Sequence, residues 1–179
     1  MTAPRPAGPP EVEIAEVGAE RLDDIERLWC DMHEHDAAVG GVRDIAPFRA
    51  AGDAWRRGRG RFESWMAAGT GRLLIAERDG SPVGFAFFRT CAGDPGFATG
   101  ERMAELVALS VEPELRRWGV GSLLMEAVED RLSAAGIDHI ALNVVSGNDD
   151  ALRFYERWGI LPSHVRCLGR VMPPAGDDP

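Results

Sequence analysis

The stretch Arg116-Arg117-Trp118-Gly119-Val120-Gly121 decides the fold of this chain. It lies between a strand-like run, Leu106 to Val111, and an amphipathic helical run, Val120 to Ala135. A glycine-containing turn that opens a helix directs several backbone N–H groups to one point beside the positive end of the helix dipole. The pattern therefore favours a bound phosphate group, with a merely structural turn as the alternative interpretation.

Two features separate this turn from the commoner nucleotide-binding turns. Met125 and Glu126 follow Ser122-Leu123-Leu124, so the pattern lacks the third glycine of a dinucleotide-binding turn. The sequence also contains no Gly-Lys-Ser/Thr, because all twenty basic residues are arginine. The absence of lysine argues against hydrolysis of a nucleoside triphosphate and excludes Schiff-base chemistry.

The bulk composition is that of one globular domain. The chain has 179 residues, of which 45% are hydrophobic and 27% charged, and we expect residues 12–172 to form the domain between disordered tails at 1–11 and 173–179. Three scattered cysteines, and the lack of a signal peptide or a long apolar run, predict a cytoplasmic protein that does not enter a membrane. A net charge of −9 argues against nucleic-acid binding and is compatible with a cationic amine substrate.

Hydrophobic periodicity and turn residues predict alternating helices and strands along the chain. The expected order is a strand at Val12–Ala15, helices at Ala19–Met32 and Ala46–Ala68 (the second interrupted by Gly58 and Gly60), a hairpin of Arg72–Glu77 and Pro82–Thr90, a mobile loop at Cys91–Gly100, a strand at Met103–Val111, a helix at Val120–Ala135, a strand at Ile137–Val145, a helix from Asn148 or Asp149 to Trp158, and one or two strands within Leu161–Met172. This order indicates a mixed α/β sheet.

Two blocks of the sequence resemble one known family. The run Glu112–Leu124 resembles the acyl-CoA-binding signature Gln/Arg-x-x-Gly-x-Gly/Ala of the GCN5-related N-acetyltransferases (GNAT), with Arg116, Gly119 and Gly121 on its defined positions. The run Asn148–Ile160 resembles the family's Asn-x-x-Ala-x-x-x-Tyr-x-x-x-Gly-Phe block, with Ile160 in place of the aromatic residue. The resemblance covers residues 12–172. It implies a mixed, mostly antiparallel central sheet with splayed central strands and flanking helices, and acetyl-CoA as co-substrate without a metal.

The resemblance also implies where the cofactor would bind. Splayed strands would leave backbone groups of Leu109 and Val111 to pair with the amides of the pantetheine arm, because such groups require partners. The pyrophosphate would lie on the N–H groups from Arg117 to Ser122, with Arg116 or Arg117 adding positive charge. The implied binding residues are Leu109, Val111, Arg116, Arg117, Gly119, Val120, Gly121, Ser122 and Asn148. A backbone N–H of Leu109 or Val111 would hold the oxyanion.

Tyr155, the only tyrosine, is expected from the resemblance to protonate the departing thiolate. A phenol is protonated at neutral pH and is able to donate. The alternative is a half-buried aromatic side chain that packs beside Phe154. Asn148 is expected both to cap the last helix and to bind the cofactor, although capping alone would explain it.

Glu105 is the expected general base, since the strand places it on the approach to the glycine turn and it resembles the catalytic glutamate of histone-type members. Strand alternation predicts that it shares a face with Val107 and Leu109. A surface charge at a strand edge, or removal of the proton through waters, are the alternatives. His33 and His35, expected at the end of the first helix, are interpreted as lining the acceptor region, because residues two apart do not share a helix face for a metal.

These patterns favour an enzyme that transfers the acetyl group of acetyl-CoA to a primary amine by direct attack in a ternary complex. The acceptor would be a small molecule or a peptide, and a homodimer is possible. The alternative is an acyl-CoA-binding sensor or interaction module that has lost turnover.

Overall fold

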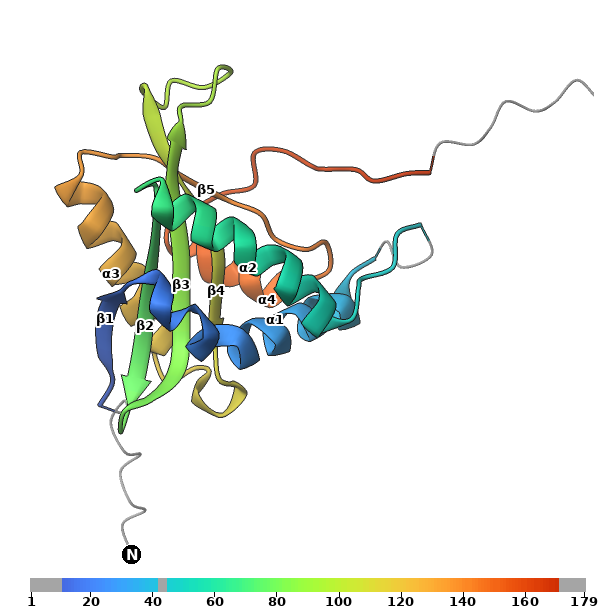
Figure 1. Ribbon diagram of the computed structural model, residues 1–179. Helices are drawn as coiled ribbons and strands as arrows, with labels where there is room; N and C mark the ends of the chain where they lie inside the picture. The colour runs from blue at the N-terminus through green and yellow to red at the C-terminus, as the bar shows by residue number, and fades with distance from the viewer. Residues whose placement is uncertain (1–10, 42–44, 171–179) are drawn as a thin grey trace, which may run out of the picture.

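The structure, a computed structural model, describes residues 11–41 and 45–170, so nearly all of both expected tails lies outside the described residues. Within them, one sheet has the order β1-β2-β3-β4-β5 (Figure 1). Its strands are β1 (Glu13–Val17), β2 (Gly71–Arg78), β3 (Ser81–Ala92), β4 (Arg102–Val111) and β5 (Ile140–Leu142). The first four pair antiparallel and β5 runs parallel to β4, which confirms the mixed, mostly antiparallel sheet.

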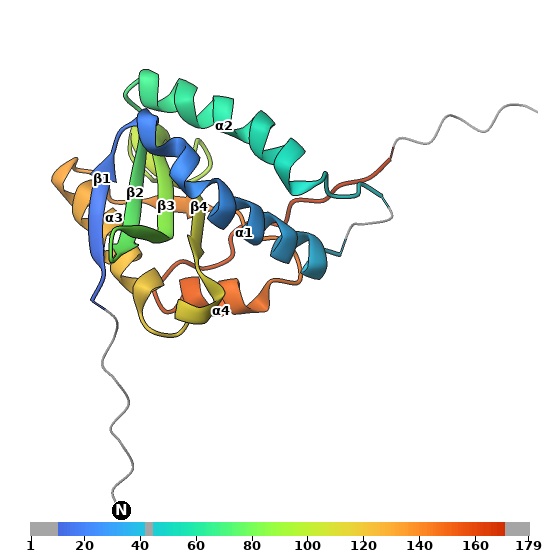
Figure 2. The same cartoon turned by 60° about the horizontal axis from the view of Figure 1, so that its bottom comes forward.

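Helices cover both faces of the sheet (Figure 2). A 3-10 segment, η1 (Ala19–Ile25), leads into α1 (Glu26–Val39), which packs with α2 (Ala51–Ala67) on one face. A short 3-10 turn, η2 (Pro113–Leu115), precedes α3 (Val120–Ala134) on the other face, where α4 (Asp149–Glu156) also lies. Because the central strands are buried on both sides, β2 and β3 carry nearly continuous apolar runs.

The hairpin between β2 and β3 has the two-residue turn that its sequence favours. Asp79 and Gly80 have φ of 52° and 74°, and Arg78 pairs with Ser81 directly across the turn. Two successive positive φ values match the right-handed twist of the flanking strands. The predicted hairpin is therefore confirmed.

A β-bulge in the β3–β4 pair changes which face of the sheet the β4 side chains point to. Phe87 pairs with Ala108 and Phe88 with Leu106, so Val107 is the extra residue. Alternation fails at a bulge because two residues oppose one. The expectation that Glu105 shares a face with both Val107 and Leu109 is wrong for Leu109, which packs in the α3 cluster while Val107 packs in the α1–α2 cluster.

The parallel pairing of β4 with β5 stops part-way along β4. Its register runs from Ala104 opposite Ile140 to Leu106 opposite Leu142, while β4 continues to Val111. No pairing with β5 is described for residues 107–111, so the two strands separate in the part of β4 that leads to the glycine turn. The expected splay is therefore present, although β5 is shorter than the predicted Ile137–Val145 strand.

The first two helices differ from their predictions, and the second also begins at Ala51 and not at Ala46. The first helix continues past Met32 to Val39, so His33 and His35 lie within α1 and not at its end. The second helix is continuous through Gly58 and Gly60. Tertiary packing overrides the low helix propensity of glycine here, because Trp55 and Phe62 of the same helix are buried in the core on this face of the sheet.

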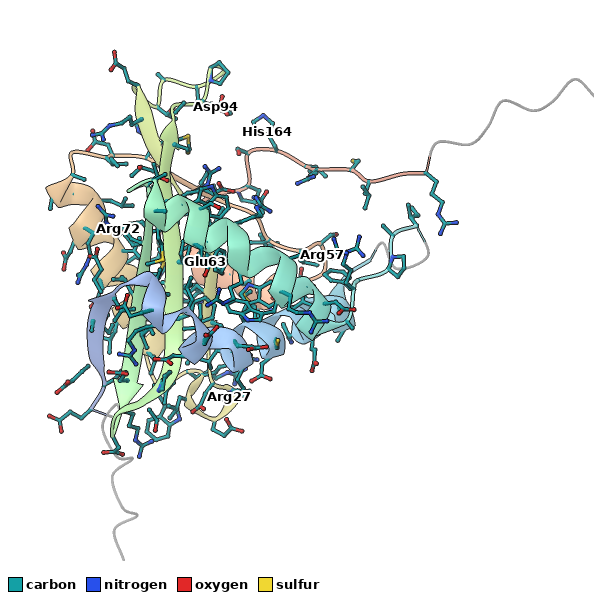
Figure 3. All side chains as sticks on the ribbon, in the orientation of Figure 1. Arg27, Arg57, Glu63, Arg72, Asp94 and His164 are labelled. Atoms are coloured by element: carbon teal, nitrogen blue, oxygen red, sulfur yellow. The ribbon has the colours of Figure 1, made fainter. Side chains whose placement is uncertain are left out.

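The chain also differs from prediction after β3 and after α4. β3 extends to Ala92 and so contains Cys91, which was expected in a loop. No strand forms at 161–170, the described part of the predicted Leu161–Met172 strands; this segment runs away from the sheet (Figure 1). Figure 3 shows His164 on this segment near the loop that carries Asp94, and the His164 ring lies 5.4 Å from that of Phe97.

Candidate functional site

The turn between β4 and α3 exposes the first backbone N–H groups of a helix. Gly119 is the N-cap of α3 and has φ of 88°, and Arg117 also adopts a left-handed φ, of 67°. No side chain caps this helix. The first N–H groups of a helix have no intrahelical partner, and here they begin on an exposed turn at the positive end of a 15-residue helix.

Gly121 joins this turn to α4. A Cβ at Gly121 would lie 3.6 Å from the Phe154 ring and 3.8 Å from a methyl group of Val111. The end of β4, the start of α3 and the aromatic face of α4 therefore meet at one place. Phe154 in turn contacts Tyr155, with ring centroids 5.2 Å apart at 72°.

Two arginines bring positive charge to the turn. Arg116 donates from Nε to the carbonyl oxygen of Val111 at 3.2 Å, which ties the turn to the end of β4. Arg117 is exposed, and its charge reaches α4, where it contributes to lowering the pKa of Asp150 after the larger effect of Arg153. An anion on the N–H groups of the turn would thus lie among fixed positive charges.

Tyr155 is well placed to remain protonated. Burial, and then the negative charge of Asp36, raise the pKa of its phenol to about 12. The phenol is consequently a proton donor throughout the neutral range. The packing that the sequence suggested beside Phe154 is also present, so the two interpretations of Tyr155 are compatible.

Asn148 connects α4 to α1. Its Oδ1 accepts from the backbone N–H of Ala151 at 3.1 Å, which confirms the predicted cap. Its Nδ2 donates to Oδ1 of Asp36 at 3.1 Å. Both ends of the amide are therefore used within the protein, and a bond to the cofactor would be additional to these two.

Glu105 is ion-paired and not free. Its carboxylate contacts Arg89 at 2.7 Å through Nε and at 2.5 Å through Nη2. The Arg89 guanidinium also lies over the Trp65 ring, 4.7 Å from its centroid. Glu105 therefore lies on the α2 side of the sheet and is ion-paired with Arg89 there.

The histidines of α1 have separate surroundings. His33 stacks on Trp29 at 5.1 Å between centroids, and its Nε2 lies 3.0 Å from the Arg49 carbonyl oxygen. His35 lies toward α4, close enough to act electrostatically on Asp36 and Asp150. Among the described residues, no group of three or more His, Cys, Asp or Glu side chains is arranged to hold a metal ion.

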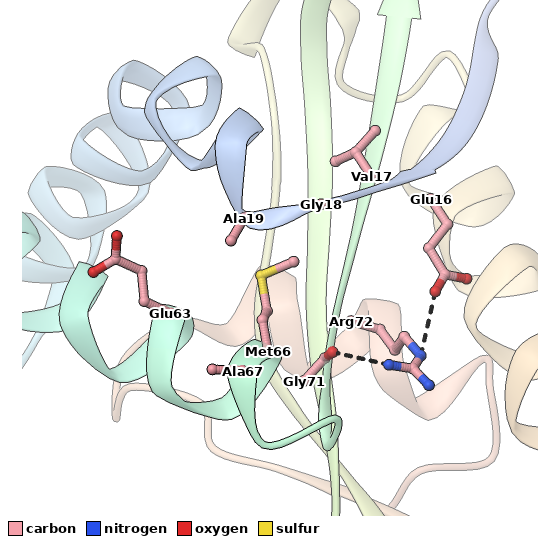
Figure 4. Close-up of a pocket in the computed structure, with 9 residues that line it drawn as sticks. All are labelled: Glu16, Val17, Gly18, Ala19, Glu63, Met66, Ala67, Gly71 and Arg72. Carbon is pink, nitrogen blue, oxygen red and sulfur yellow. Dashed lines mark hydrogen bonds and ion pairs between the residues drawn. The ribbon is translucent and has the colours of Figure 1, made fainter.

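One surface pocket lies away from these residues, at the edge of the sheet where β1 meets α2 (Figure 4). It is lined by Glu16, Val17, Gly18, Ala19, Glu63, Met66, Ala67, Gly71 and Arg72. Glu16 and Arg72 form an ion pair across it at 3.2 Å. None of the residues that the sequence indicated for binding or catalysis lines it.

Among the described helices, none has both the length and the apolar character that a membrane span requires.

Comparison with known proteins identifies the family of this chain. Residues 22–160 match the acetyltransferase (GNAT) family. The chain belongs to this family. Over 103 residues it is 36% identical to a mycothiol acetyltransferase of Sanguibacter keddieii; that segment covers 58% of this chain and 31% of the relative, so it spans about a third of that protein's length.

Solved structures share the GNAT fold with this chain. A GCN5-related N-acetyltransferase from Ralstonia eutropha superimposes with a TM-score of 0.72 at 17% identity, covering 88% of this chain and 97% of that one. A predicted acetyltransferase from Clostridium acetobutylicum, solved with acetyl-CoA, has a TM-score of 0.67 at 14% identity, covering 86% and 92%. At these identities the likeness establishes the fold.

Sequence reasoning missed two residues of this region, Asp36 and Arg89. Asp36 follows His33 and His35 in a run of polar residues, and nothing in its own neighbourhood indicates a partner 112 positions later in the chain. Arg89 stands opposite Glu105 in the hairpin register, and cross-strand pairing of the two predicted strands was the signal that would have found it.

Proposed function

We propose that this chain is an N-acetyltransferase that moves the acetyl group of acetyl-CoA to a primary amine by direct attack in a ternary complex. The observation that carries the proposal is the meeting of the turn before α3 with α4 at Val111, Gly121 and Phe154. It joins the N-terminus of α3 and the helix that carries Tyr155 to the end of β4, beyond the last β4–β5 pair. Membership of the GNAT family supports the same reaction class.

The cofactor would bind along the surface formed by the turn before α3, the end of β4 and α4. Its pyrophosphate would accept hydrogen bonds from the N–H groups of residues 117–122, with Arg116 and Arg117 adding charge. Its pantetheine amides would pair with the backbone of Leu109 and Val111, beyond the last β4–β5 pair at Leu106. Asn148, at the N-cap of α4, would add a further contact.

The chemistry would need no covalent intermediate. The amine nitrogen attacks the thioester carbonyl carbon, a backbone N–H of Leu109 or Val111 holds the oxyanion, and the C–S bond breaks. Tyr155 gives its proton to the departing sulfur, since its pKa of about 12 keeps the proton in place until thiolate forms. Glu105, the base indicated by the sequence, would have to accept the amine proton while paired with Arg89.

The proposed acceptor is a small-molecule or peptide amine. Support comes from the name of one relative, a mycothiol acetyltransferase, and from structural neighbours described as aminoglycoside acetyltransferases. The net charge of −9 also favours a cationic acceptor over an anionic one.

The test combines calorimetry with a thiol-release assay on the full chain. We expect heat on titration with acetyl-CoA, and release of free CoA when spermidine, kanamycin, alaninamide or a peptide with a free N-terminus is added. The acid role of Tyr155 predicts that Y155F binds acetyl-CoA as tightly as wild type but turns over about 100-fold or more slowly. Binding without thiol release by wild type would favour the sensor alternative, and no binding would contradict both functions.

A further inference from the structure

Asp36 is a carboxylate at the meeting of α1 and α4 that the proposed mechanism does not use. It lies in the last turn of α1, is half-buried, and accepts from Nδ2 of Asn148 at 3.1 Å. The helix end and the loop before α4 are in close backbone contact, because a Cβ at Gly147 would lie 2.5 Å from the Val39 carbonyl oxygen. The Asn148 hydrogen bond thus joins the carboxylate to the N-cap of α4.

The same carboxylate acts on Tyr155. Its charge contributes, after burial, to raising the pKa of the phenol. Asp36 is hydrogen-bonded to Asn148 at the start of α4, and Phe154 of the same helix contacts both Gly121 and Tyr155, so α4 links the carboxylate, the phenol and the start of α3. A base for the incoming amine must lie in such a region, within reach of the nitrogen that attacks beside the phenol.

Glu105 differs from Asp36 in its partner. Its carboxylate is held by an arginine through two contacts, at 2.5 and 2.7 Å, and is therefore already engaged by a cation. Asp36 is held by a neutral amide, which fixes its orientation without supplying a full positive charge. Of the two carboxylates, Asp36 is better suited to accept a proton.

We propose that the carboxylate of Asp36 takes a proton from the ammonium group of the acceptor amine. This inference rests on the proposed function. The ammonium gives one proton to Asp36, and the neutral amine then forms the N–C bond at the thioester carbon. The C–S bond breaks and the sulfur takes the Tyr155 proton; the second proton on nitrogen restores the phenol, and Asp36 returns its proton to solvent. The balance is one acetamide, one free thiol and one released proton.

The environment of Asp36 supports this role. Burial raises its pKa above the ordinary value, and the Asn148 bond opposes the rise. The charges of His35 and His33 on α1 oppose it as well, and the charge of Asp36 in turn acts on Tyr155 of α4. A carboxylate whose pKa is moved toward neutrality is a stronger base than an exposed one.

The test compares the full chain with its D36N variant. The amide introduced by this substitution keeps an oxygen that accepts from Asn148 Nδ2, so the variant removes the base while preserving the contact. We expect kcat/KM for thiol release with the amine panel to fall about 100-fold, the acetyl-CoA affinity to stay within about threefold, and the ascending limb of the pH profile assigned to Asp36 to disappear. D31N, which removes another α1 carboxylate, paired with Arg27 at 3.4 Å, is the matched control and should keep wild-type turnover.

Three outcomes separate the possibilities. A D36N variant with wild-type kcat/KM and pH profile would overturn the inference while leaving the proposed acetyl transfer intact. Loss of activity in D36A together with full activity in D36N would also overturn it, because Asp36 would then act only by positioning Asn148. A wild-type chain that binds acetyl-CoA and releases no thiol would remove the proposed function itself, and the base role with it.

A second measurement needs no acceptor. Because Tyr155 is the only tyrosine, the absorbance of phenolate reports its titration alone. We expect the D36N variant to titrate Tyr155 at lower pH than wild type, because a nearby negative charge is removed. An unchanged titration would show that the carboxylate lies too far from the phenol to serve the same reaction.

Discussion

Arg89 and Glu105 stand opposite each other across β3 and β4, and the guanidinium that holds the Glu105 carboxylate also lies over the Trp65 ring of α2. The pair therefore joins two strands and a helix. In this pair, Arg89 engages the Glu105 carboxylate, which the sequence indicated as the general base. Its contribution to stability should be small, because both side chains remain partly exposed.

Replacing Glu105 with glutamine tests this arrangement. The glutamine amide oxygen can still accept a hydrogen bond from Arg89, so we expect E105Q to keep kcat/KM for thiol release within about threefold of wild type, far less than the loss of about 100-fold or more that removal of a general base produces. Steady-state kinetics with acetyl-CoA and the amine panel measure this. A loss comparable to that of D36N would return the base role to Glu105.

Substitutions in the glycine turn should distinguish the effect of a positive φ at Gly119 from the effect of a larger side chain at Gly121. At Gly119, φ is 88°, so alanine there should cost about 1–2 kcal/mol of unfolding free energy and displace the N–H groups that would bind pyrophosphate. We expect G119A to weaken acetyl-CoA binding by about tenfold or more in calorimetry, which corresponds to about 1.4 kcal/mol. G121A is the control, since its Cβ would make ordinary contacts at 3.6 Å. Wild-type affinity in G119A would refute the proposed anion site.

Tyr155 predicts a loss of stability in alkali. Its phenol has a pKa of about 12 in the folded chain against an ordinary value of 10.0, so the folded state holds the proton more tightly. The free energy of unfolding should therefore be unaffected by Tyr155 below pH 10 and fall as pH rises toward 12. Urea unfolding at pH 9 and pH 11 measures the fall, and Y155F should show less of it. Equal slopes in both proteins would contradict the burial of the phenol.

Asp36 predicts a pH dependence on the acid side. Its pKa is raised on folding, so the folded state binds the proton more tightly and the free energy of unfolding falls as pH rises through the interval above the ordinary value of 3.8. D36N should remove this fall and be at least as stable as wild type at neutral pH, although it loses activity. Denaturant unfolding between pH 4 and pH 7 tests this, and marked destabilisation of D36N at pH 7 would contradict it.

Asn148 has two roles that variants can separate. N148A removes the cap and the contact to Asp36, and loss of the cap alone should cost about 1 kcal/mol. N148S keeps a capping oxygen while its shorter side chain loses the bond to Asp36. We expect thermal unfolding to rank wild type above N148S and N148S above N148A. Equal stability of the two variants would indicate that the cap contributes little.

Local patterns predicted most of the elements. The hairpin, α3 and α4 follow from features that act within a few residues: the Asp79–Gly80 turn, the apolar stripe of α3, and the Asn148 cap. The two blocks that resemble the family predicted that the glycine turn precedes the helix that carries Tyr155. The strand boundaries were predicted less accurately, because they depend on pairing with a neighbouring strand. β5 covers only Ile140–Leu142, since its pairing with β4 ends at Leu142.

The sequence by itself determined the mixed sheet, the glycine turn at the start of α3 and the helix that carries Tyr155, because each is encoded by neighbouring residues. Only the tertiary structure decided which carboxylates are available. The bulge at Val107 set the facing of β4, the register placed Arg89 against Glu105, and the packing of α1 on α4 brought Asp36 to Asn148. These contacts join residues far apart in the chain, and their energies depend on burial and charge in three dimensions.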